Sequence, residues 1–408
     1  MNTSGTKATN KRISHGDKIT ATLFVSFIVV FLVVLLASGF PKTFLTDYRN
    51  TVPPGTPVLE RVEQAIDLFD SLIVESVPAH DLFIEVYGGS QIILGKKTIP
   101  DPNYSYLFLS ESGQITYQIP KRELTLEAEK VIELKTALSK EGIPFLWVLA
   151  PFRLLDPTEV TPITFDYGDE NANSFLAQLE SQGVSRLDLR TPFRDYIYEG
   201  FSQQDLFFNT DHHWTIPAAL KATGIIATNL QEELGIPIDP SVYEEENYTF
   251  ETQKDSFIGS MGRRVGVLYG GKDDFTLVLP KFPTDIQLRE REYGVTTETR
   301  GSFEESVLVK ENLEDPELTA NRYAAYHGDN EELVFINHQV DEGKILIIKD
   351  SFGVPVYSFL SLGVHEVRAL DPRLYKGSIL EYAKEYQPEV VIFLYNVDSL
   401  NAEMFQWE

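Results

Sequence analysis

Short apolar runs alternate with amphipathic stretches along most of the chain. The runs that are long enough for one strand lie at 145–151, 185–190, 205–209, 343–350, 366–370 and 389–395. Between them, residues 122–140, 173–182 and 216–234 repeat apolar positions at helical spacing. Apolar strands that alternate with helices are typical of a parallel sheet covered on both faces. The pattern therefore predicts a three-layer α/β domain built on a parallel central sheet.

Near the N-terminus, the 22-residue stretch Ile19–Phe40 contains no charged residue. As a helix it would span roughly 30 Å, the thickness of the hydrocarbon core of a bilayer. The alternative, a cleaved signal peptide, has a shorter apolar core of about 7–15 residues, so a retained transmembrane helix at 19–40 is favoured. More basic residues precede this stretch (Lys7, Lys11, Arg12 and Lys18) than closely follow it (Lys42 and Arg49). This asymmetry predicts a cytoplasmic tail at 1–18, with the rest of the chain outside the cell.

The segment after the apolar stretch differs from both of its neighbours. Residues 41–80 combine prolines at 41, 53, 54 and 57 with helical spacing over 61–77, which predicts a stalk and a helix. Apolar runs at 83–87, 90–94 and 106–109 are separated by turn residues and predict a small β-rich entry region. We expect one extracytoplasmic α/β domain over 81–408. It includes an irregular, acidic insertion or lid around 240–340, with a strand at 275–279.

Composition and charge exclude several classes of function. An apolar fraction of 43% with 12% aromatics supplies a full core, and the chain has no cysteine. The lack of cysteine rules out disulfides, thiolate metal sites and a cysteine nucleophile. The formal net charge of −26 repels phosphate backbones, so nucleic acid is not expected as a partner.

Two polar motifs, Asn209–Thr215 and Ile347–Gly353, each follow a predicted apolar strand. Ligands of open α/β sheets bind at the carboxyl ends of strands, where both motifs should therefore lie. In the second motif, Ser351 falls at a sharp turn between a strand and a helix, which would expose its hydroxyl as a nucleophile if a base takes the proton. The alternative is that Ser351 caps the following helix.

The first motif offers the base. Asp211 and His213 are two residues apart and point the same way in an extended segment, so the carboxylate can orient the imidazole, whereas His212 points to the other side. The chemistry does not choose between the two histidines, and the spacing prefers His213. Two alternatives remain open. One is a histidine packed on Trp214, and the other is a metal site that combines Asp211 with one histidine and a third ligand such as His327, His338 or a glutamate.

Together the motifs resemble those of a known family. Asp211-His212-His213-Trp214, then Lys349-Asp-Ser-Phe-Gly353, then Leu394-Tyr-Asn396 resemble the DHHW-motif family of Gram-positive bacteria. That family is similar to the SGNH-type O-acetyltransferase modules of bacterial alginate acetylation. The resemblance covers roughly residues 80–400 and implies an SGNH-hydrolase-like (flavodoxin-like) fold. By position, it implies that Asp211 orients, His213 is the general base and Ser351 is the nucleophile. Lys349 departs from the pattern, because glycine often stands there.

Other residues are candidates for supporting roles. Asn396 ends the last apolar strand and is either an oxyanion donor or a turn asparagine. Tyr326, Gly328 and Arg263 stand in stretches that resemble those near the site in related modules. Arg263, like Arg264, either contacts an acidic glycan or is a solvated surface residue. Asp350 is expected to accept backbone hydrogen bonds around the serine turn, and Arg153 to line the cleft.

The sequence thus predicts a membrane-anchored serine enzyme that needs no cofactor or metal. Ser351 would accept an acyl group and pass it to a sugar hydroxyl or to water, as an O-acyltransferase or acetylesterase of cell-surface polysaccharide. A multi-pass membrane protein that supplies the acyl group is a partner implied by the resemblance. The alternatives are a non-catalytic carbohydrate-binding or scaffold protein of the cell envelope and a metal-dependent hydrolase.

Overall fold

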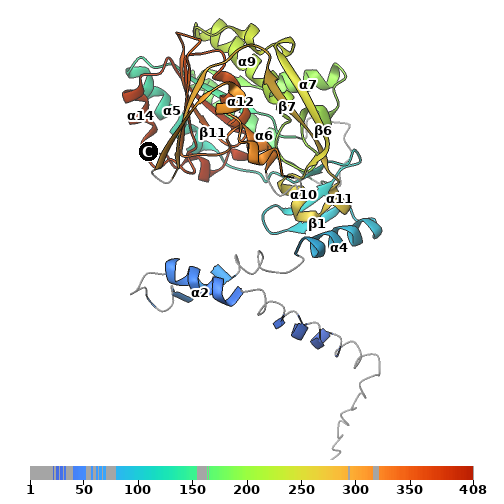
Figure 1. Ribbon diagram of the computed structural model, residues 1–408. Helices are drawn as coiled ribbons and strands as arrows, with labels where there is room; N and C mark the ends of the chain where they lie inside the picture. The colour runs from blue at the N-terminus through green and yellow to red at the C-terminus, as the bar shows by residue number, and fades with distance from the viewer. Residues whose placement is uncertain are drawn as a thin grey trace, which may run out of the picture. The chain divides into compact units, whose positions relative to one another are not determined.

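The structure, a computed structural model, describes residues 80–153, 163, 165–292, 295–315 and 321–407, together with parts of 22–69. The chain divides into two compact units, residues 1–84 and residues 85–408 (Figure 1). Within the first unit, helix α2 spans Phe40–Thr51, although the prolines predict an irregular stalk there. The helix tolerates Pro41 because the first turn needs no backbone N–H.

The predicted transmembrane helix at 19–40 lies mostly outside the described residues. Among the residues that the structure does describe, no helix combines the length and the apolar character needed to cross a membrane. The second half of the predicted helix at 61–77 also lies outside them. The anchor therefore stays a prediction from the sequence.

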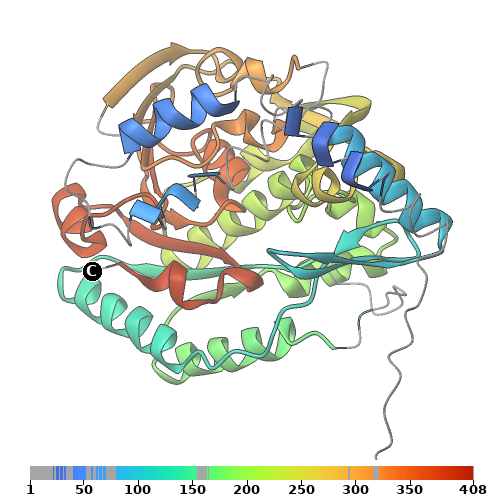
Figure 2. The ribbon, with the colours of Figure 1, turned by 90° about the horizontal axis from the view of Figure 1, so that it is seen from below.

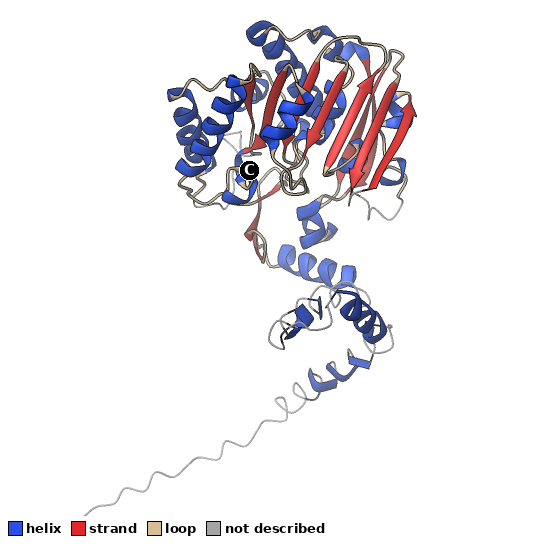
Figure 3. Cartoon of the chain, turned by 90° about the vertical axis from the view of Figure 1, so that its left-hand side faces the viewer, coloured by secondary structure: helices blue, strands red, loops and turns tan. Residues whose placement is uncertain are grey.

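An eight-stranded sheet forms the centre of the second unit (Figure 3). In spatial order its strands are β5 (Arg186–Asp188), β4 (Phe145–Ala150), β13 (Val390–Asn396), β11 (Lys344–Lys349), β12 (Glu366–Leu370), β10 (Glu332–Asn337), β8 (Ile286–Glu292) and β9 (Val295–Gly301). The first five are parallel, and β10, β8 and β9 join antiparallel. The sheet is therefore mixed, not wholly parallel as predicted. Residues 338–343, which link β10 to β11, are too few for the crossover that parallel strands require.

Helices cover both faces of this sheet, as the alternating pattern predicts. Helices α5 (Thr125–Lys140), α6 (Gly168–Ser181) and α14 (Ile379–Tyr386) contribute to one core cluster, and α7 (Arg190–Tyr198), α9 (Ile216–Leu234) and α13 (Gly353–Leu360) to the other. Figure 2 shows α5 and α6 side by side on their face of the sheet. Strand β4 contributes side chains to both clusters, because successive side chains of a pleated strand point to opposite faces, Trp147 to one and Val148 to the other. This explains its unbroken apolar sequence.

The entry region differs from its prediction. Residues 83–87 and all but the last of residues 90–94, predicted as strands, lie in helix α4 (His80–Ile93). Tertiary contacts hold this helix: the Glu85 carboxylate accepts the backbone N–H groups of Val267 and Leu268, and Gly88 lies against the Val265 carbonyl. The strand at 106–109 is confirmed as β2 (Ser105–Leu109), which pairs with β1 (Thr98–Asp101) and β3 (Ile115–Thr116) in a small antiparallel sheet.

Two further segments depart from the sequence pattern. Residues 205–209 do not form a strand of the sheet. They end helix α8 (Gln203–Leu206), whose start is capped by Ser202, and Phe207 makes a single bridge to Trp214. Residues 240–340 are more regular than an insertion or lid. They contain a separate two-stranded sheet, β6 (Tyr248–Phe257) and β7 (Asp273–Pro280), short helices α10 (Ser260–Val265), α11 (Val267–Gly270) and α12 (Phe303–Ser306), and the strands β8 to β10.

Candidate active site

Ser351 lies in the turn that joins β11 to α13, at the carboxyl end of the parallel strands. The buried Asp350 carboxylate holds this turn by accepting the backbone N–H of Phe352 at 2.9 Å and of Asn396 at 2.6 Å, as predicted. Burial raises the pKa of Asp350. The N-cap of α13 is Phe352, without a side-chain cap, so Ser351 does not cap the helix. Its side chain is partly exposed.

Three side chains meet in a hydrogen-bonded series at this turn. His213 Nε2 lies 2.7 Å from Ser351 Oγ, and His213 Nδ1 lies 2.5 Å from Asp211 Oδ1. Asp211 also accepts the backbone N–H of His213 at 3.0 Å and of Ser260 at 2.7 Å. Burial works to raise the pKa of Asp211, but the two imidazoles and these hydrogen bonds hold it well below its usual range. The carboxylate is thus ionised and can fix one tautomer of the His213 ring.

Two buried ionisable side chains, Arg153 and Asp273, hold the loop that carries Asp211 and His213. Arg153, fully buried, donates to the backbone carbonyls of Asp211 and Phe208. Burial lowers the pKa of Arg153 to about 10, so it stays charged at neutral pH. On the other side, Asp273 accepts the N–H of Asn209 at 2.7 Å and of Thr210 at 2.8 Å. Arg153 therefore supports the loop. The prediction that it lines the cleft is wrong, because its side chain is fully buried.

Helix α10 packs tightly against this loop. The backbone N–H groups of Met261 and Gly262 donate to the Thr210 carbonyl at 3.1 and 2.8 Å. A Cβ on Gly259 would lie 2.2 Å from Asp211 Cβ and 2.6 Å from its Oδ2. Glycine is required at 259 because the backbone of α10 approaches the carboxylate so closely.

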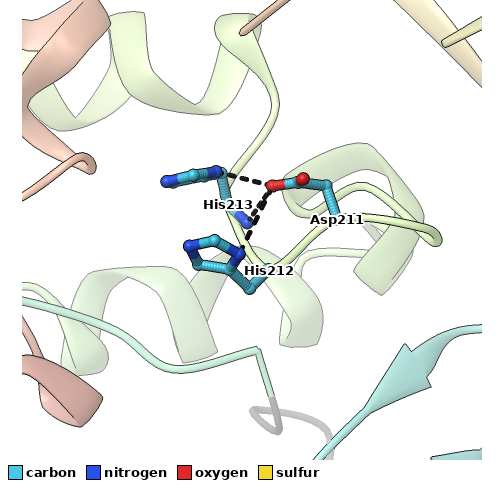
Figure 4. A group of neighbouring side chains, drawn as sticks. All are labelled: Asp211, His212 and His213. Atoms are coloured by element: carbon cyan, nitrogen blue, oxygen red, sulfur yellow. Dashed lines mark hydrogen bonds and ion pairs between the residues drawn. The ribbon is translucent and has the colours of Figure 1, made fainter. Parts of the chain in front are cut away.

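His212 lies beside the series without being part of it. Its Nδ1 is 3.2 Å from Ser260 Oγ, and its ring centroid is 3.9 Å from that of His213. Burial, followed by the charge of His213, lowers the pKa of His212 to about 3, so this ring is neutral at physiological pH. Figure 4 shows the Asp211 carboxylate facing Nδ1 of both rings, with the second nitrogen of each directed away from it.

The ligand atoms of Asp211, His212 and His213 lie within 4.8 Å of one another, close enough for a metal ion. The 2.5 Å between His213 Nδ1 and Asp211 Oδ1 is a hydrogen-bond distance, however, whereas two ligands of a tetrahedral zinc ion would be roughly 3.3 Å apart. The other predicted ligands are engaged elsewhere, His327 with Glu290 at 3.0 Å and His338 with Gln287 at 3.0 Å. The geometry fits a hydrogen-bonded pair of Asp211 and His213 better than a metal site.

An aromatic residue that the sequence did not single out holds the imidazole in place. The ring of Tyr323 stacks on His213 with centroids 4.0 Å apart and planes 12° from parallel. Its hydroxyl accepts the Trp214 indole N–H at 3.1 Å. Tyr323 belongs to the short helix η4 (Arg322–Tyr326), and no periodicity marks it out.

The described hydrogen bonds of the supporting candidates from the sequence go to other residues than Asp211, His213 and Ser351. The Tyr326 hydroxyl is buried and bonds the Val278 carbonyl and N–H at 3.0 and 2.8 Å, and the Gly328 carbonyl accepts the Tyr357 hydroxyl. The Asn396 amide donates to the Pro151 carbonyl at 2.7 Å and accepts the Asp398 N–H at 2.9 Å, as in the turn alternative. Arg263 donates to the Ile258 carbonyl at 3.0 Å.

Lys349, the departure from the family pattern, is the centre of a buried ion network. Its ammonium group lies 3.0 Å from Asp371 and also contacts Asp329. Arg373 pairs with the same two carboxylates, at 2.5 Å from Asp371 and 2.9 Å from Asp329. Burial disfavours charge on Lys349, but the two carboxylates outweigh it and raise the pKa. The network anchors the end of β11 directly before the serine turn.

Part of the chain matches a known family, and its fold is similar to that of solved structures. Residues 105–270 match the family described as SGNH hydrolase-like domain, acetyltransferase AlgX. The solved structure of Bacillus cereus PatB1 with a sulfonyl adduct is 19% identical, has a TM-score of 0.61, and covers 76% of this chain and 100% of that chain. A DHHW family protein from Eubacterium siraeum is 16% identical, with a TM-score of 0.56, over 75% of this chain and 94% of that chain. No curated protein sequence matches significantly.

The resemblance given by the motifs is confirmed by these findings. The described chain has an SGNH hydrolase-like α/β fold with a mixed central sheet, and residues 105–270 are similar to a domain described as an acetyltransferase.

Proposed function

We propose that this protein is a membrane-anchored, extracytoplasmic serine O-acyltransferase or acetylesterase that acts on cell-surface polysaccharide. The single observation that carries the proposal is the continuous series from Asp211 through His213 to Ser351, with contacts of 2.5 and 2.7 Å. A nucleophile bonded to a base, which is itself oriented by a third group, defines such sites by geometry. The order of these residues along the chain is no obstacle.

The proposed reaction proceeds in two steps. Ser351 Oγ attacks the carbonyl carbon of an acyl ester while His213 Nε2 takes the hydroxyl proton. The tetrahedral intermediate then expels the alcohol, which receives that proton, and leaves an acyl-serine. In the second step His213 takes a proton from a sugar hydroxyl or from water, whose oxygen attacks the acyl-serine. Collapse of this intermediate returns the proton to Ser351 and releases the acylated sugar or the free acid. The ionised Asp211 stabilises the imidazolium in both steps.

The backbone N–H of Ser351 is positioned to donate a hydrogen bond to the developing oxyanion. No acceptor for this N–H occurs among the residues that the structure describes, and an amide at the nucleophile is well placed to donate to the oxyanion. The Asn396 side-chain amide donates to the Pro151 carbonyl. We therefore assign the oxyanion donor to the backbone N–H of Ser351 and not to Asn396.

The cellular setting of the proposal rests on the sequence and the family. The uncharged stretch at 19–40 would anchor the chain with its C-terminal domain outside the cell. The match of residues 105–270 to a domain described as an acetyltransferase favours acyl transfer over hydrolysis, and the proposed acceptor is a sugar hydroxyl. A multi-pass membrane protein would then supply the acyl group as a partner.

The experiment that tests the proposal combines turnover with labelling. The full-length protein in detergent is expected to release acetate from 4-nitrophenyl acetate and to lose this activity on treatment with an aromatic sulfonyl fluoride. Mass spectrometry should find the sulfonyl group on Ser351. A sulfonyl adduct was captured in Bacillus cereus PatB1, which makes this reagent a suitable probe. Activity that survives the reagent, or a label on another residue, would contradict the assignment. Activity abolished by chelators would favour the metal-dependent alternative.

Replacing Gly259 with alanine tests the positioning of Asp211. The added Cβ would lie 2.2 Å from Asp211 Cβ, so Asp211 or the backbone at 259 must shift, which disturbs the contact between the carboxylate and His213. A displacement of about 1 Å in such a site costs on the order of 10²-fold in rate. We expect kcat for 4-nitrophenyl acetate to fall by about that factor. The matched control is Gly224→Ala in helix α9, where the nearest atom is Tyr243 Cβ at 3.5 Å, and which should leave kcat unchanged. Equal activity of both variants would show that Asp211 need not hold its position.

A further inference from the structure

A groove of about 730 Å³ lies between the small sheet β1–β3 and the segment that follows β13. Five of its twelve lining residues are aromatic, and we name it the aromatic groove by six of its residues: Tyr104, Tyr106, Tyr117, Arg122, Phe165 and Asp398. Two of the rings are open to solvent, since Tyr106 is 47% and Phe165 is 52% exposed. Exposed large aromatics gathered in one concave surface usually mark a binding site.

The aromatic groove neighbours the candidate active site on the side of Asp211, through Tyr104 and Ser260. Tyr104 stacks on Tyr117 with centroids 4.3 Å apart, and its hydroxyl lies beside Ser260. The backbone N–H of Ser260 donates to Asp211 at 2.7 Å. Tyr104 therefore stands one residue away from the hydrogen-bonded series.

A second connection links the groove to the serine turn. Asp398, on the groove wall, donates its backbone N–H to the Asn396 side chain at 2.9 Å. The backbone N–H of Asn396 in turn donates to Asp350, the residue before Ser351, at 2.6 Å. Through these two hydrogen-bonded connections the groove lies beside the site, on the side of Ser260 and on the side of Asn396.

The charges of the groove are paired with one another. Arg122 bonds Asp398 Oδ1 at 2.7 Å and the backbone carbonyls of Asp398 and Leu400 at 2.6 and 3.1 Å. Arg264, which lies over the Tyr104 ring at 5.5 Å, faces Asp101 at 3.5 Å. The net charge of −26 further repels an anionic chain. Stacking surfaces without a spare positive charge suit an uncharged ligand.

We propose that the aromatic groove binds the acceptor of the acyl group, and that this acceptor is a neutral glycan of hexose or N-acetylhexosamine units. The inference rests on the proposed function, because it assigns an acceptor to the same site. The apolar faces of the sugar rings pack on Tyr106 and Phe165, and the polar rim, including Gln118 and Asn103, meets the ring hydroxyls. An acidic glycan finds no unpaired guanidinium in the described part of the groove.

The test measures binding separately from turnover. The full-length Ser351→Ala protein is titrated by calorimetry with the tetramers of glucose, of N-acetylglucosamine and of galacturonate. We expect at least one neutral tetramer to bind and the galacturonate tetramer not to. Tyr106→Ala, added to Ser351→Ala, should weaken the neutral tetramer about tenfold, as expected for loss of a central aromatic contact. The control is Tyr198→Ala, which removes an aromatic ring that is 75% exposed and outside the groove, and it should not change the affinity.

Three results would overturn the inference: binding of galacturonate in preference to both neutral tetramers, no binding of either neutral tetramer, or an affinity that Tyr106→Ala leaves unchanged. Failure here is distinct from failure of the proposed function. Binding in Ser351→Ala does not depend on catalysis, and ester release with labelling of Ser351 does not depend on the groove.

Discussion

Replacing Ser351 with alanine is expected to lower the rate of ester release by about 10⁶-fold and to abolish sulfonyl labelling. Without the hydroxyl no acyl-serine forms, and only general stabilisation by the remaining site can assist the reaction. The fold should be retained, because Ser351 lies in a turn held by the Asp350 carboxylate and its own side chain bonds only His213 among the described residues. The measurement is kcat for 4-nitrophenyl acetate, with thermal unfolding of each variant as the check on folding.

Two further variants test whether the loss of activity in Ser351→Ala is due to the missing nucleophile. Ser351→Cys places a thiol nucleophile at the same point, so part of the activity and labelling by iodoacetamide should appear. Ser174→Ala removes an exposed serine on helix α6 and should behave as the wild type. If Ser351→Ala kept more than about a tenth of the activity, the nucleophile would have to be sought elsewhere and the non-catalytic or metal-dependent alternatives would gain weight.

The second large effect is expected at the base. His213→Gln should lower kcat by about 10³- to 10⁴-fold, since the amide cannot take the serine proton. Asp211→Asn should act in the same direction, because a neutral amide lets the imidazole adopt the wrong tautomer and no longer stabilises the imidazolium. Glutamine is preferred to alanine at 213 because it leaves a polar partner for the buried Asp211 charge. The measurement is the dependence of kcat on pH for each variant.

His212 supplies the matched control for that experiment. His212→Phe keeps an aromatic ring against His213 but removes both nitrogens. His212 Nδ1 lies 3.2 Å from Ser260 Oγ, whereas the ring nitrogen bonded to Ser351 belongs to His213. Because the pKa of His212 is also lowered to about 3, its imidazole is a weak base, and we expect kcat to fall less than about tenfold. A loss in His212→Phe as large as that in His213→Gln would show that the roles of the two histidines are assigned wrongly.

Much of the architecture could be predicted because its signals are local. The apolar runs of β4, β11, β12 and β13 and the amphipathic repeats of α5 and α9 lie where the sequence places them, within a few residues. The spacing of Asp211 and His213 predicted that carboxylate and imidazole would face each other, and they share a hydrogen bond. The proximity of Ser351 was expected from two motifs at strand ends, although residues 205–209 are not a strand of the sheet. Whether these three residues catalyse the reaction stays a prediction.

Other features depend on contacts between segments that are distant in the sequence. Helix α4 takes up residues predicted as strands because Glu85 and Gly88 meet α10 and α11. The support of the loop by Arg153, 58 residues away from Asp211 in sequence, and the stacking of Tyr323 on His213 leave no periodic signal. The ion network around Lys349 and the low pKa of His212 likewise follow from burial and from charges brought near by folding.

The sequence by itself determined the α/β alternation, the uncharged stretch at 19–40, and the serine, histidine and carboxylate that carry the proposed chemistry, because hydrophobic period and residue chemistry are properties of short segments. Only the tertiary structure decided which histidine meets Ser351, what holds the loop beneath it, and that an aromatic groove lies beside the site. Those outcomes arise when burial removes water and brings remote groups within a few ångströms, where packing and electrostatics outweigh local preference.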